Sequence, residues 1–254
     1  MTMIRHWTFL SVGLILLVQD SAGFTGTVAT RQGIRSSTAT ELFGIRQFLK
    51  NRIFRRTTND STPTETIQSA LIKRRTVNNF RSDVTVPSEI VHQAVEAAIY
   101  APNHKLTEPW RFIHLGPETI DAIATLNSSV IAAKDPVKGA KKKARWAAIP
   151  GWTVITSCRS DKDDIVLDRE DYAATSCAIQ NFQLSLYAAS VGTKWTSGPI
   201  TRTPEFAELC GIDLETEHVV GCLWYGYVDG DDGFDGITTP TRRKSVEAVT
   251  SWRP

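Results

Sequence analysis

The stretch from residue 100 to residue 112, YAPNHKLTEPWRF, constrains the fold more than any other part of the sequence. It stands between a segment with helical spacing and a segment rich in β-formers. Its two prolines fix φ and remove two backbone donors, so the chain turns here. A polar turn of this kind presents ligand-binding groups on a rigid scaffold, and His104, Lys105 and Arg111 suit an anionic or heteroaromatic ligand. The same spacing is equally compatible with a basic surface loop.

Helical and strand-like segments alternate along the chain. Helices are predicted at about 66–74, 87–100, 117–126, 137–145, 172–190 and 205–210, and strands at 110–115, 152–158 and 219–228. Residues 127–135 are ambiguous. Gly192 is expected to cap the helix 172–190, and an acidic, glycine-rich loop is expected at 229–236. This order of elements predicts an α+β domain.

The segment 172–190 is rich in Ala and Leu and carries no acidic residue. A helix that is apolar around much of its circumference is buried or forms an interface. We therefore expect this helix in the core of a homodimer.

Composition excludes several classes of protein. A chain of 254 residues allows one large domain or two small ones, and a net charge of +2 gives no indication of nucleic-acid binding. The four cysteines show neither C-x-x-C spacing nor a tight framework, which argues against a structural zinc site and a disulfide scaffold. We interpret one dense cationic run as a solvated helix face rather than a binding patch: Lys138, Lys141, Lys142, Lys143 and Arg145.

The N-terminal quarter has the composition of targeting segments. An apolar run at 7–18, too short to span a bilayer comfortably, follows two basic residues and precedes small residues at 21–23, which is a signal-peptide pattern over 1–23. Residues 24–63 are rich in Ser, Thr and Arg with the single acid Glu41 up to residue 56, as in a transit peptide followed by a linker. Helical spacing at 42–53 is also compatible with an extra helix of the mature domain.

These two patterns in tandem, with Phe24 at the predicted cleavage point, resemble the bipartite presequence of plastid proteins in algae with secondary plastids. The expected location is therefore the plastid, with secretion as the alternative, and no stable membrane anchor is expected after processing. The functional domain is expected over residues 64–254.

Four motifs stand in the order in which the nitroreductase family of FMN enzymes has them. The loop 100–112 resembles the family's small residue–Pro–x–His–x–x–x–x–Pro–Trp–Arg–Phe loop, and residues 72–80, IKRRTVNNF, resemble its Arg-Arg-Ser/Thr motif. Residues 172–192 and 193–199 are similar to its long interface helix and its flavin-contacting Trp-Thr/Ser-Gly turn. The strand 219–228 and the basic tail 242–244 complete a resemblance that covers roughly residues 66–254.

The resemblance implies a nitroreductase-like mixed sheet flanked by helices, and a homodimer whose two subunits share each FMN site. Its motifs assign the FMN phosphate to Arg74, Arg75 and Thr76, with Arg242 or Arg243 as a second contact. Arginine suits this role because its guanidinium can bind two phosphate oxygens at once.

By the same resemblance, four residues contact the flavin ring: His104, Trp195, Thr196 and Ser197. The chemistry would belong to the flavin, which takes hydride from NAD(P)H and passes it to a nitroaromatic, a quinone or a similar electron-poor acceptor. No catalytic side chain and no metal site are therefore predicted, and no Gly-x-Gly-x-x-Gly follows a strand. The alternatives are a specialised flavin enzyme for reductive dehalogenation or flavin fragmentation, and a non-catalytic FMN- or pigment-binding protein.

Two positions depart from the family pattern. Tyr100 stands where small bacterial nitroreductases often carry an arginine, so one cation near a phosphate could be missing. Lys194 precedes Trp195 where a small or apolar residue is common. Lys194 could bind an acidic substrate or point into solvent, and the sequence favours solvent.

Overall fold

The computed structural model describes residues 63–159, 164–238, 241–242 and 244–253, all within one compact unit, Asn59–Pro254. The predicted signal peptide, the transit-like segment up to residue 62 and the alternative helix at 42–53 lie outside the described residues, as does Arg243. No helix in the described part is long and apolar enough to cross a membrane.

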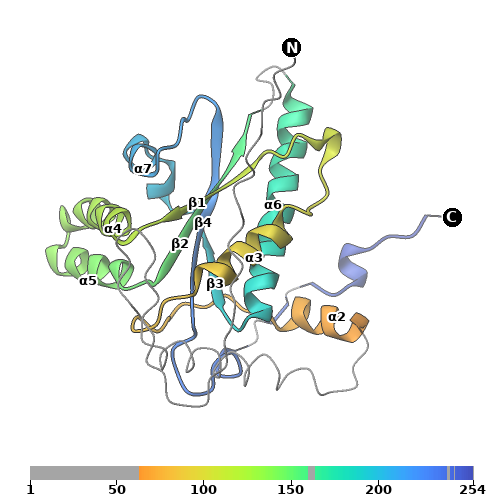
Figure 1. Cartoon of the computed structure of the whole chain (residues 1–254), viewed down its shortest axis with the longest axis horizontal. Coiled ribbons are helices and arrows are strands. Elements are labelled where there is room, and N and C mark those ends of the chain that lie inside the picture. Colours follow the sequence, from red (N-terminus) through yellow and green to blue (C-terminus); the bar gives the residue numbers. More distant parts are fainter. Residues whose placement is uncertain (1–62, 160–163, 239–240, 243, 254) are drawn as a thin grey trace, which may run out of the picture. The chain divides into compact units, whose positions relative to one another are not determined.

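A four-stranded sheet in the order β1-β2-β4-β3 forms the centre of this unit (Figure 1). The strands are β1 (Trp110–Leu115), β2 (Gly151–Cys158), β3 (Gly192–Thr196) and β4 (Glu217–Gly226). Each neighbouring pair of these strands is antiparallel. The parallel component of this mixed sheet is the bridge between Thr76 and Thr193 at the outer edge of β3.

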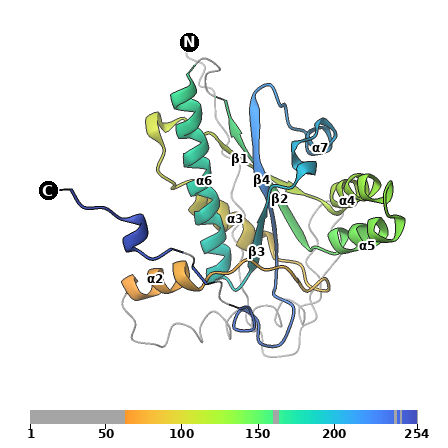
Figure 2. The same cartoon turned by 180° about the vertical axis from the view of Figure 1, so that it is seen from behind.

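Helices cover both faces of the sheet, as the two opposite views show (Figures 1 and 2). One face carries α3 (Ser88–Ala98) and the long α6 (Ile165–Ala188). The other carries α4 (Pro117–Ala132), α5 (Pro136–Ala147) and α7 (Pro204–Cys210). The remaining elements are α2 (Pro63–Lys73) and the short 3₁₀ helices η1 (His104–Leu106), η2 (Pro199–Arg202) and η3 (Glu247–Val249).

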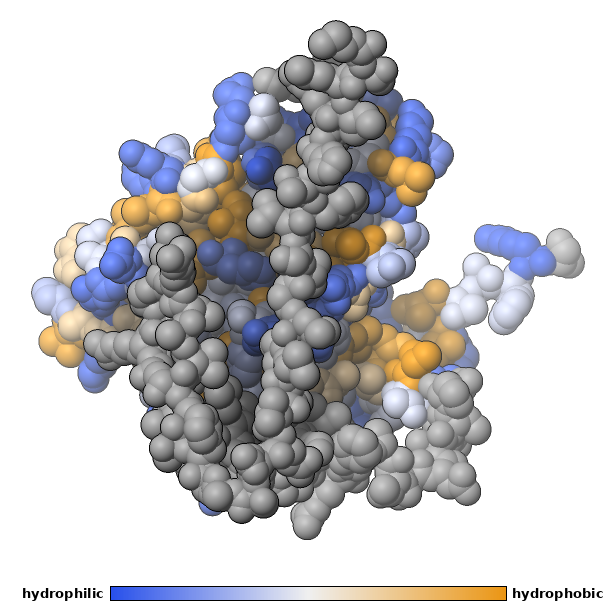
Figure 3. All heavy atoms as spheres, in the orientation of Figure 1, coloured by the Kyte–Doolittle hydropathy of each residue, from blue (hydrophilic) through white to orange (hydrophobic). Residues whose placement is uncertain are grey.

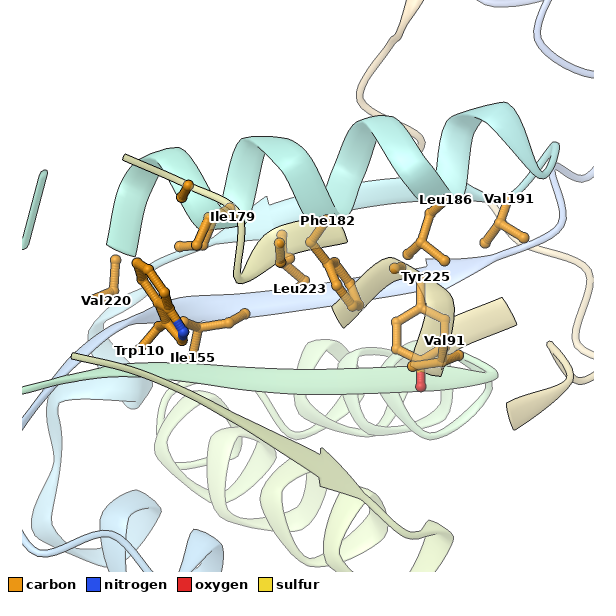
Figure 4. Packing of buried hydrophobic residues seen from close by; sticks show 14 of the residues in the cluster. Val91, Trp110, Ile155, Ile179, Phe182, Leu186, Val191, Val220, Leu223 and Tyr225 are labelled. Carbon is orange, nitrogen blue, oxygen red and sulfur yellow. The ribbon is translucent and has the colours of Figure 1, made fainter. Parts of the chain in front are cut away.

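Two hydrophobic cores follow from the alternation of side chains along the strands. On β4, Leu223 and Tyr225 face α3 and α6, whereas Cys222 and Trp224 face α4, α5 and α7. Figure 4 shows the first core, in which Ile179, Phe182 and Leu186 project from α6 towards the strands. The second core contains the mutually contacting indoles of Trp146, Trp152 and Trp224.

The helix predicted at 172–190 begins earlier than the sequence analysis placed it. Asp164 caps α6, because its carboxylate accepts hydrogen bonds from the backbone N–H groups of Val166 and Leu167. Nine α6 residues are buried within the same chain, so much of the apolar surface that suggested a dimer core covers the chain's own sheet. Helix α4 likewise continues through most of the ambiguous segment 127–135.

The prediction that Gly192 caps this helix is wrong. Gly192 begins β3, and the left-handed turn after α6 is made by Ser190 with φ of 63°. Gly192 is required for another reason: a Cβ on it would lie 2.5 Å from a methyl carbon of the buried Val77. The glycine therefore allows the Arg-Arg-Thr segment to lie against β3.

We predict that Gly192→Ala destabilises the protein by about 1–3 kcal/mol, because the added methyl overpacks the contact with Val77. Gly116→Ala is the matched control, since a Cβ there meets no atom within 4 Å. Thermal unfolding of both variants measures the difference. Equal melting temperatures would show that the Val77 contact is not tight.

Candidate functional site

A cavity of about 800 Å³ opens beside the Arg-Arg-Thr segment. Four of the predicted site residues line it: Arg74, Arg75, Thr76 and Arg242. Asn78 and Asn79 continue the same wall, and the loop from Val228 to Thr238 forms the opposite wall. Residues far apart in the sequence thus meet around one space that is large enough for a small-molecule ligand.

Backbone pairing places the Arg-Arg-Thr segment at this cavity. The N–H of Val77 donates to the carbonyl of Thr193 over 2.9 Å, which extends the sheet beyond β3. Further along, the N–H of Arg81 donates to the carbonyl of Tyr227 over 2.9 Å, and Phe80 bridges Val228. The segment therefore lies between the edge strand and the continuation of β4, with its arginines at the end of α2.

Three arginines concentrate positive charge on the cavity. Burial and the charges of Arg75 and Arg242 lower the pKa of Arg74, and its buried Nε has no hydrogen-bond partner among the described residues. A buried donor without a partner is costly. Like charges at close range raise that cost further. An anion bound between these guanidinium groups would remove both penalties.

Arg75 has a structural role as well. Its Nη1 donates to the carbonyl of Arg74 over 3.0 Å and to the carbonyl of Ile72. Both carbonyls belong to the C-terminal end of α2, where the helix has no further N–H groups to satisfy them. Arg75 therefore stabilises the helix end, and Arg74 is the more specific candidate for an anion contact.

The opposite wall is acidic. Asp229, Asp231 and Asp232 line the cavity from the loop that follows β4, and Phe234 of this loop packs edge-on against Tyr187 of α6 with ring centroids 4.8 Å apart. Sequence analysis predicted this loop but gave it no part in the site. The glycine-rich, acidic composition right after a core strand was the available signal.

The predicted flavin-contacting turn lies on β3 and just beyond it. Trp195 is 39% exposed, and its indole covers Gly221 of β4, where a Cβ would lie 2.2 Å from the indole Nε1. Thr193, two residues earlier on the same face of the strand, accepts a hydrogen bond of 3.0 Å from Gln183 of α6. Trp195, Thr196 and Ser197 do not line the cavity of the arginines, but Thr193 joins both features through its pairing with Val77.

The loop that carries His104 is strained and held firmly in place. Lys105, Leu106 and Glu108 all have φ between 46° and 57°, a region that side chains other than glycine rarely adopt. Thr107 donates to the fully buried Asp171 of α6, and the side chain of Asn103 bonds both Thr107 and the N–H of Glu108. This network holds His104 exposed on the surface.

Within one chain, His104 and the arginines lie at different ends of α6. The His104 loop is attached at Asp171, whereas β3 and the Arg-Arg-Thr segment are attached at Gln183. These two positions are about 18 Å apart along the helix axis. The structure thus brings together Arg74, Arg75, Thr76 and Arg242, and it leaves His104 apart from them.

We predict that Thr107→Val destabilises the protein by about 1–3 kcal/mol, because the buried carboxylate of Asp171 loses a donor. Thr125→Val on α4 is the control, since its hydroxyl bonds an exposed carbonyl, that of Asp121. Denaturant unfolding gives the two stabilities, and hydrogen exchange at residues 103–108 reports the loop. Equal losses in both variants would contradict the anchoring role of Asp171.

Comparison with known proteins identifies the family of this chain. The sequence model described as the Nitroreductase family matches residues 71–227. YfhC of Bacillus subtilis (strain 168), which carries the name NAD(P)H nitroreductase, is 30% identical over 168 residues, covering 64% of this chain and 84% of YfhC. YdjA of Escherichia coli (strain K12), which carries the same name, is 29% identical over 158 residues, covering 61% and 85%.

The fold agrees as well. A nitroreductase-like family protein from Bacillus cereus has a TM-score of 0.64 at 27% identity, over 78% of this chain and 98% of that one. NfnB of Mycobacterium smegmatis has a TM-score of 0.62 at 14% identity, over 76% and 100%, and therefore shows the fold alone. The predicted α+β fold is confirmed by these likenesses. The chain belongs to the nitroreductase family of flavin oxidoreductases.

Proposed function

We propose that this protein is an FMN-dependent oxidoreductase that takes hydride from NAD(P)H and passes it to nitroaromatic, quinone or similar electron-poor acceptors. The observation that carries the proposal is the cluster of Arg74, Arg75 and Arg242 on one cavity, with a buried Nε of Arg74 that has no partner in the described part of the chain. The flavin, when bound, supplies the hydride chemistry.

The cavity fits the polar half of FMN. The phosphate belongs at the arginine wall, because a guanidinium offers paired donors and full charge. The acidic wall repels phosphate, but its carboxylates can accept hydrogen bonds from the hydroxyl groups of the ribityl chain. This division of charge gives the cofactor one orientation in the cavity.

Similar structures support the cofactor assignment. A nitroreductase from Desulfovibrio desulfuricans, with a TM-score of 0.57, was solved in complex with FMN, and NfnB of Mycobacterium smegmatis was solved in complex with NADPH. In this chain, the residues of the family's Arg-Arg-Thr motif, Arg74, Arg75 and Thr76, line the cavity. This position supports the proposal that the phosphate binds at their wall.

The protein would hold the flavin ring with residues of two subunits. The strand that carries Trp195, Thr196 and Ser197 beside the arginine segment is attached to α6 at Gln183, whereas the His104 loop is attached at Asp171. These two attachment points are about 18 Å apart along the helix axis. A second subunit is therefore needed to bring a His104 loop to each ring. The ring would then lie between Trp195 of one subunit and the partner's loop, shielded from water on one face.

Exposed apolar side chains offer a surface for that partner. They lie on α2, on the His104 loop, at the start of α6 and on the C-terminal segment: Ile67, Ile72, Tyr100, Leu106, Ile165, Val166, Val249 and Trp252. Tyr100 is 85% exposed and Trp252 is 92% exposed. Figure 3 shows part of this apolar surface beside the C-terminal segment. Exposed apolar surface that gathers on one side of a molecule marks interaction sites, and a homodimer would cover such surface symmetrically.

We predict that Arg74→Gln weakens FMN binding about ten- to a hundred-fold, since one desolvated charge-assisted contact is lost. The melting temperature of the flavin-free protein should stay the same or rise, because the variant removes a buried like charge. Isothermal titration with FMN and thermal unfolding measure the two effects. Arg81→Gln is the control, since Arg81 pairs with Asp83 on the surface. Undiminished FMN affinity in Arg74→Gln would contradict the phosphate assignment.

We further predict that inactive Arg74→Gln and His104→Ala chains restore activity when they are co-expressed. A hybrid dimer then has one site with both changes and one intact site, so about a quarter of the wild-type sites return. NADPH-dependent reduction of a quinone measures the recovery, at an FMN concentration that fills wild-type sites but leaves Arg74→Gln sites empty. If both residues served the same site within one chain, no hybrid would contain an intact site and activity would stay absent.

A further inference from the structure

Lys194 is partly buried and its ammonium group has a partner, so it does not extend freely into solvent as the sequence favoured. It lies on β3 directly before Trp195, and its Nζ donates to the side-chain carbonyl of Asn78 over 2.8 Å. The same Nζ lies 5.3 Å from the ring centroid of the buried Trp224. Asn78 lines the cavity of the arginines, so Lys194, which does not line the cavity itself, is linked to it through Asn78.

Two cations of α5 lie near Lys194. Lys142 has its Nζ 5.2 Å from the ring centroid of Trp146, and the rings of Trp146 and Trp224 meet edge to face with centroids 5.2 Å apart. Arg145 precedes Trp146 in the sequence. Burial, and then the charges of Arg145 and Lys142, lower the pKa of Lys194. We call Lys142, Arg145 and Lys194 the lysine–arginine patch.

The patch carries its charge without carboxylate partners in the part of the chain that the structure describes. The ion pairs there include Lys143 with Asp121, on the same helix α5, but none involves Lys142, Arg145 or Lys194. Cation–aromatic contacts at exposed sites stabilise a charge only weakly. Three like charges at short range oppose one another, and a bound anion would relieve this repulsion.

We propose that the lysine–arginine patch binds an anionic group of the molecule that exchanges electrons with the flavin. Two sources share this chemistry: the additional ribose phosphate that distinguishes NADPH from NADH, and a carboxylate or sulfonate on the acceptor. The inference rests on the proposed function, because it places a redox partner beside the cofactor cavity. It assigns a role to part of the cationic run that sequence analysis interpreted as a solvated helix face.

The position of the patch favours a redox partner over FMN itself. The FMN phosphate has its own group of arginines on the cavity wall, whereas the patch lies on the face of β3 that carries Trp224. Lys194 joins the two through Asn78, and the next residue along the edge strand β3 is Trp195, the predicted flavin contact, whose side chain lies on the opposite face of the sheet. An anion on the patch would therefore be attached to a molecule that reaches the flavin around the edge of β3, from the side of α5.

The test compares Lys194→Met with Lys143→Met in the flavin-loaded protein. Lys143 gives the same change of charge on α5, but it is paired with Asp121 at 3.3 Å. Calorimetric titration uses two probes, adenosine monophosphate and the adenosine bisphosphate that carries the additional ribose phosphate. Steady-state kinetics compare NADPH with NADH, and a neutral naphthoquinone with its sulfonated derivative.

For a donor phosphate, Lys194→Met should raise KM for NADPH about ten-fold more than KM for NADH and weaken binding of the bisphosphate by a similar factor. For an acceptor anion, it should raise KM for the sulfonated quinone about ten-fold more than KM for the neutral quinone. Arg145→Met should act in the same direction, and Lys194→Arg should restore binding because it keeps the charge.

Equal changes for charged and uncharged partners, or effects no larger than those of Lys143→Met, would overturn the inference. Lys194 would then only hold Asn78 in place. Failure of the proposed function would look different: the wild-type protein would retain no FMN or would transfer no hydride from either nicotinamide donor.

Discussion

The backbone hydrogen bond between Val77 and Thr193 is the contact on which the candidate site depends. It attaches the segment after α2 to the outer edge of β3, and Gly192 makes that attachment close enough by leaving room for Val77. The consequences extend in both directions along the segment. Before it, Arg74 and Arg75 are brought to the cavity; after it, Asn78 receives Lys194. One pairing between main-chain atoms therefore sets the positions of two groups of cations that lie far apart in the sequence.

Those two groups contrast with the surface ion pairs of the described chain, such as Arg81 with Asp83 and Lys143 with Asp121. At Arg74 and at Lys194, burial and neighbouring like charges oppose the charged form and lower both pKa values. Arrangements that reduce the stability of the free protein are a common feature of binding sites. In the proposed sites, a bound anion would recover the energy that is lost in the free protein, and these positions would then contribute to affinity.

Local signals in the sequence predicted most elements, and long-range packing determined the rest. Strand β1 has the predicted bounds, 110–115, because a proline precedes it and Gly116-Pro117 follows it. The start of α6 was missed although Asp164 was available as a cap, because the charged residues 168–171 interrupt the apolar pattern. Gly192 was misread as a cap because its function is a contact with Val77, more than a hundred residues away. The candidate phosphate-site residues came from a motif, whereas the acidic loop after β4 was predicted as a loop but its place on the cavity follows only from the fold.

Helix α6 determines how the two parts of the site are spaced. The loop of His104 is attached to it at Asp171, and β3 is attached to it at Gln183, so one rigid helix separates a half-site at each end. The left-handed residues of the His104 loop are strained. The hydrogen bonds of Thr107 with Asp171 and Asn103 keep the loop in this conformation in the free subunit. In the proposed dimer, a two-fold axis relates the α6 helices of the two subunits, so both helices have the same spacing between their two attachment points. The axis would bring the His104 loop of each subunit to the arginines of the other. Assembly would then complete the site without further folding of either part, because each part is already ordered within its own chain. Such preorganisation reduces the entropy that is lost when the cofactor binds.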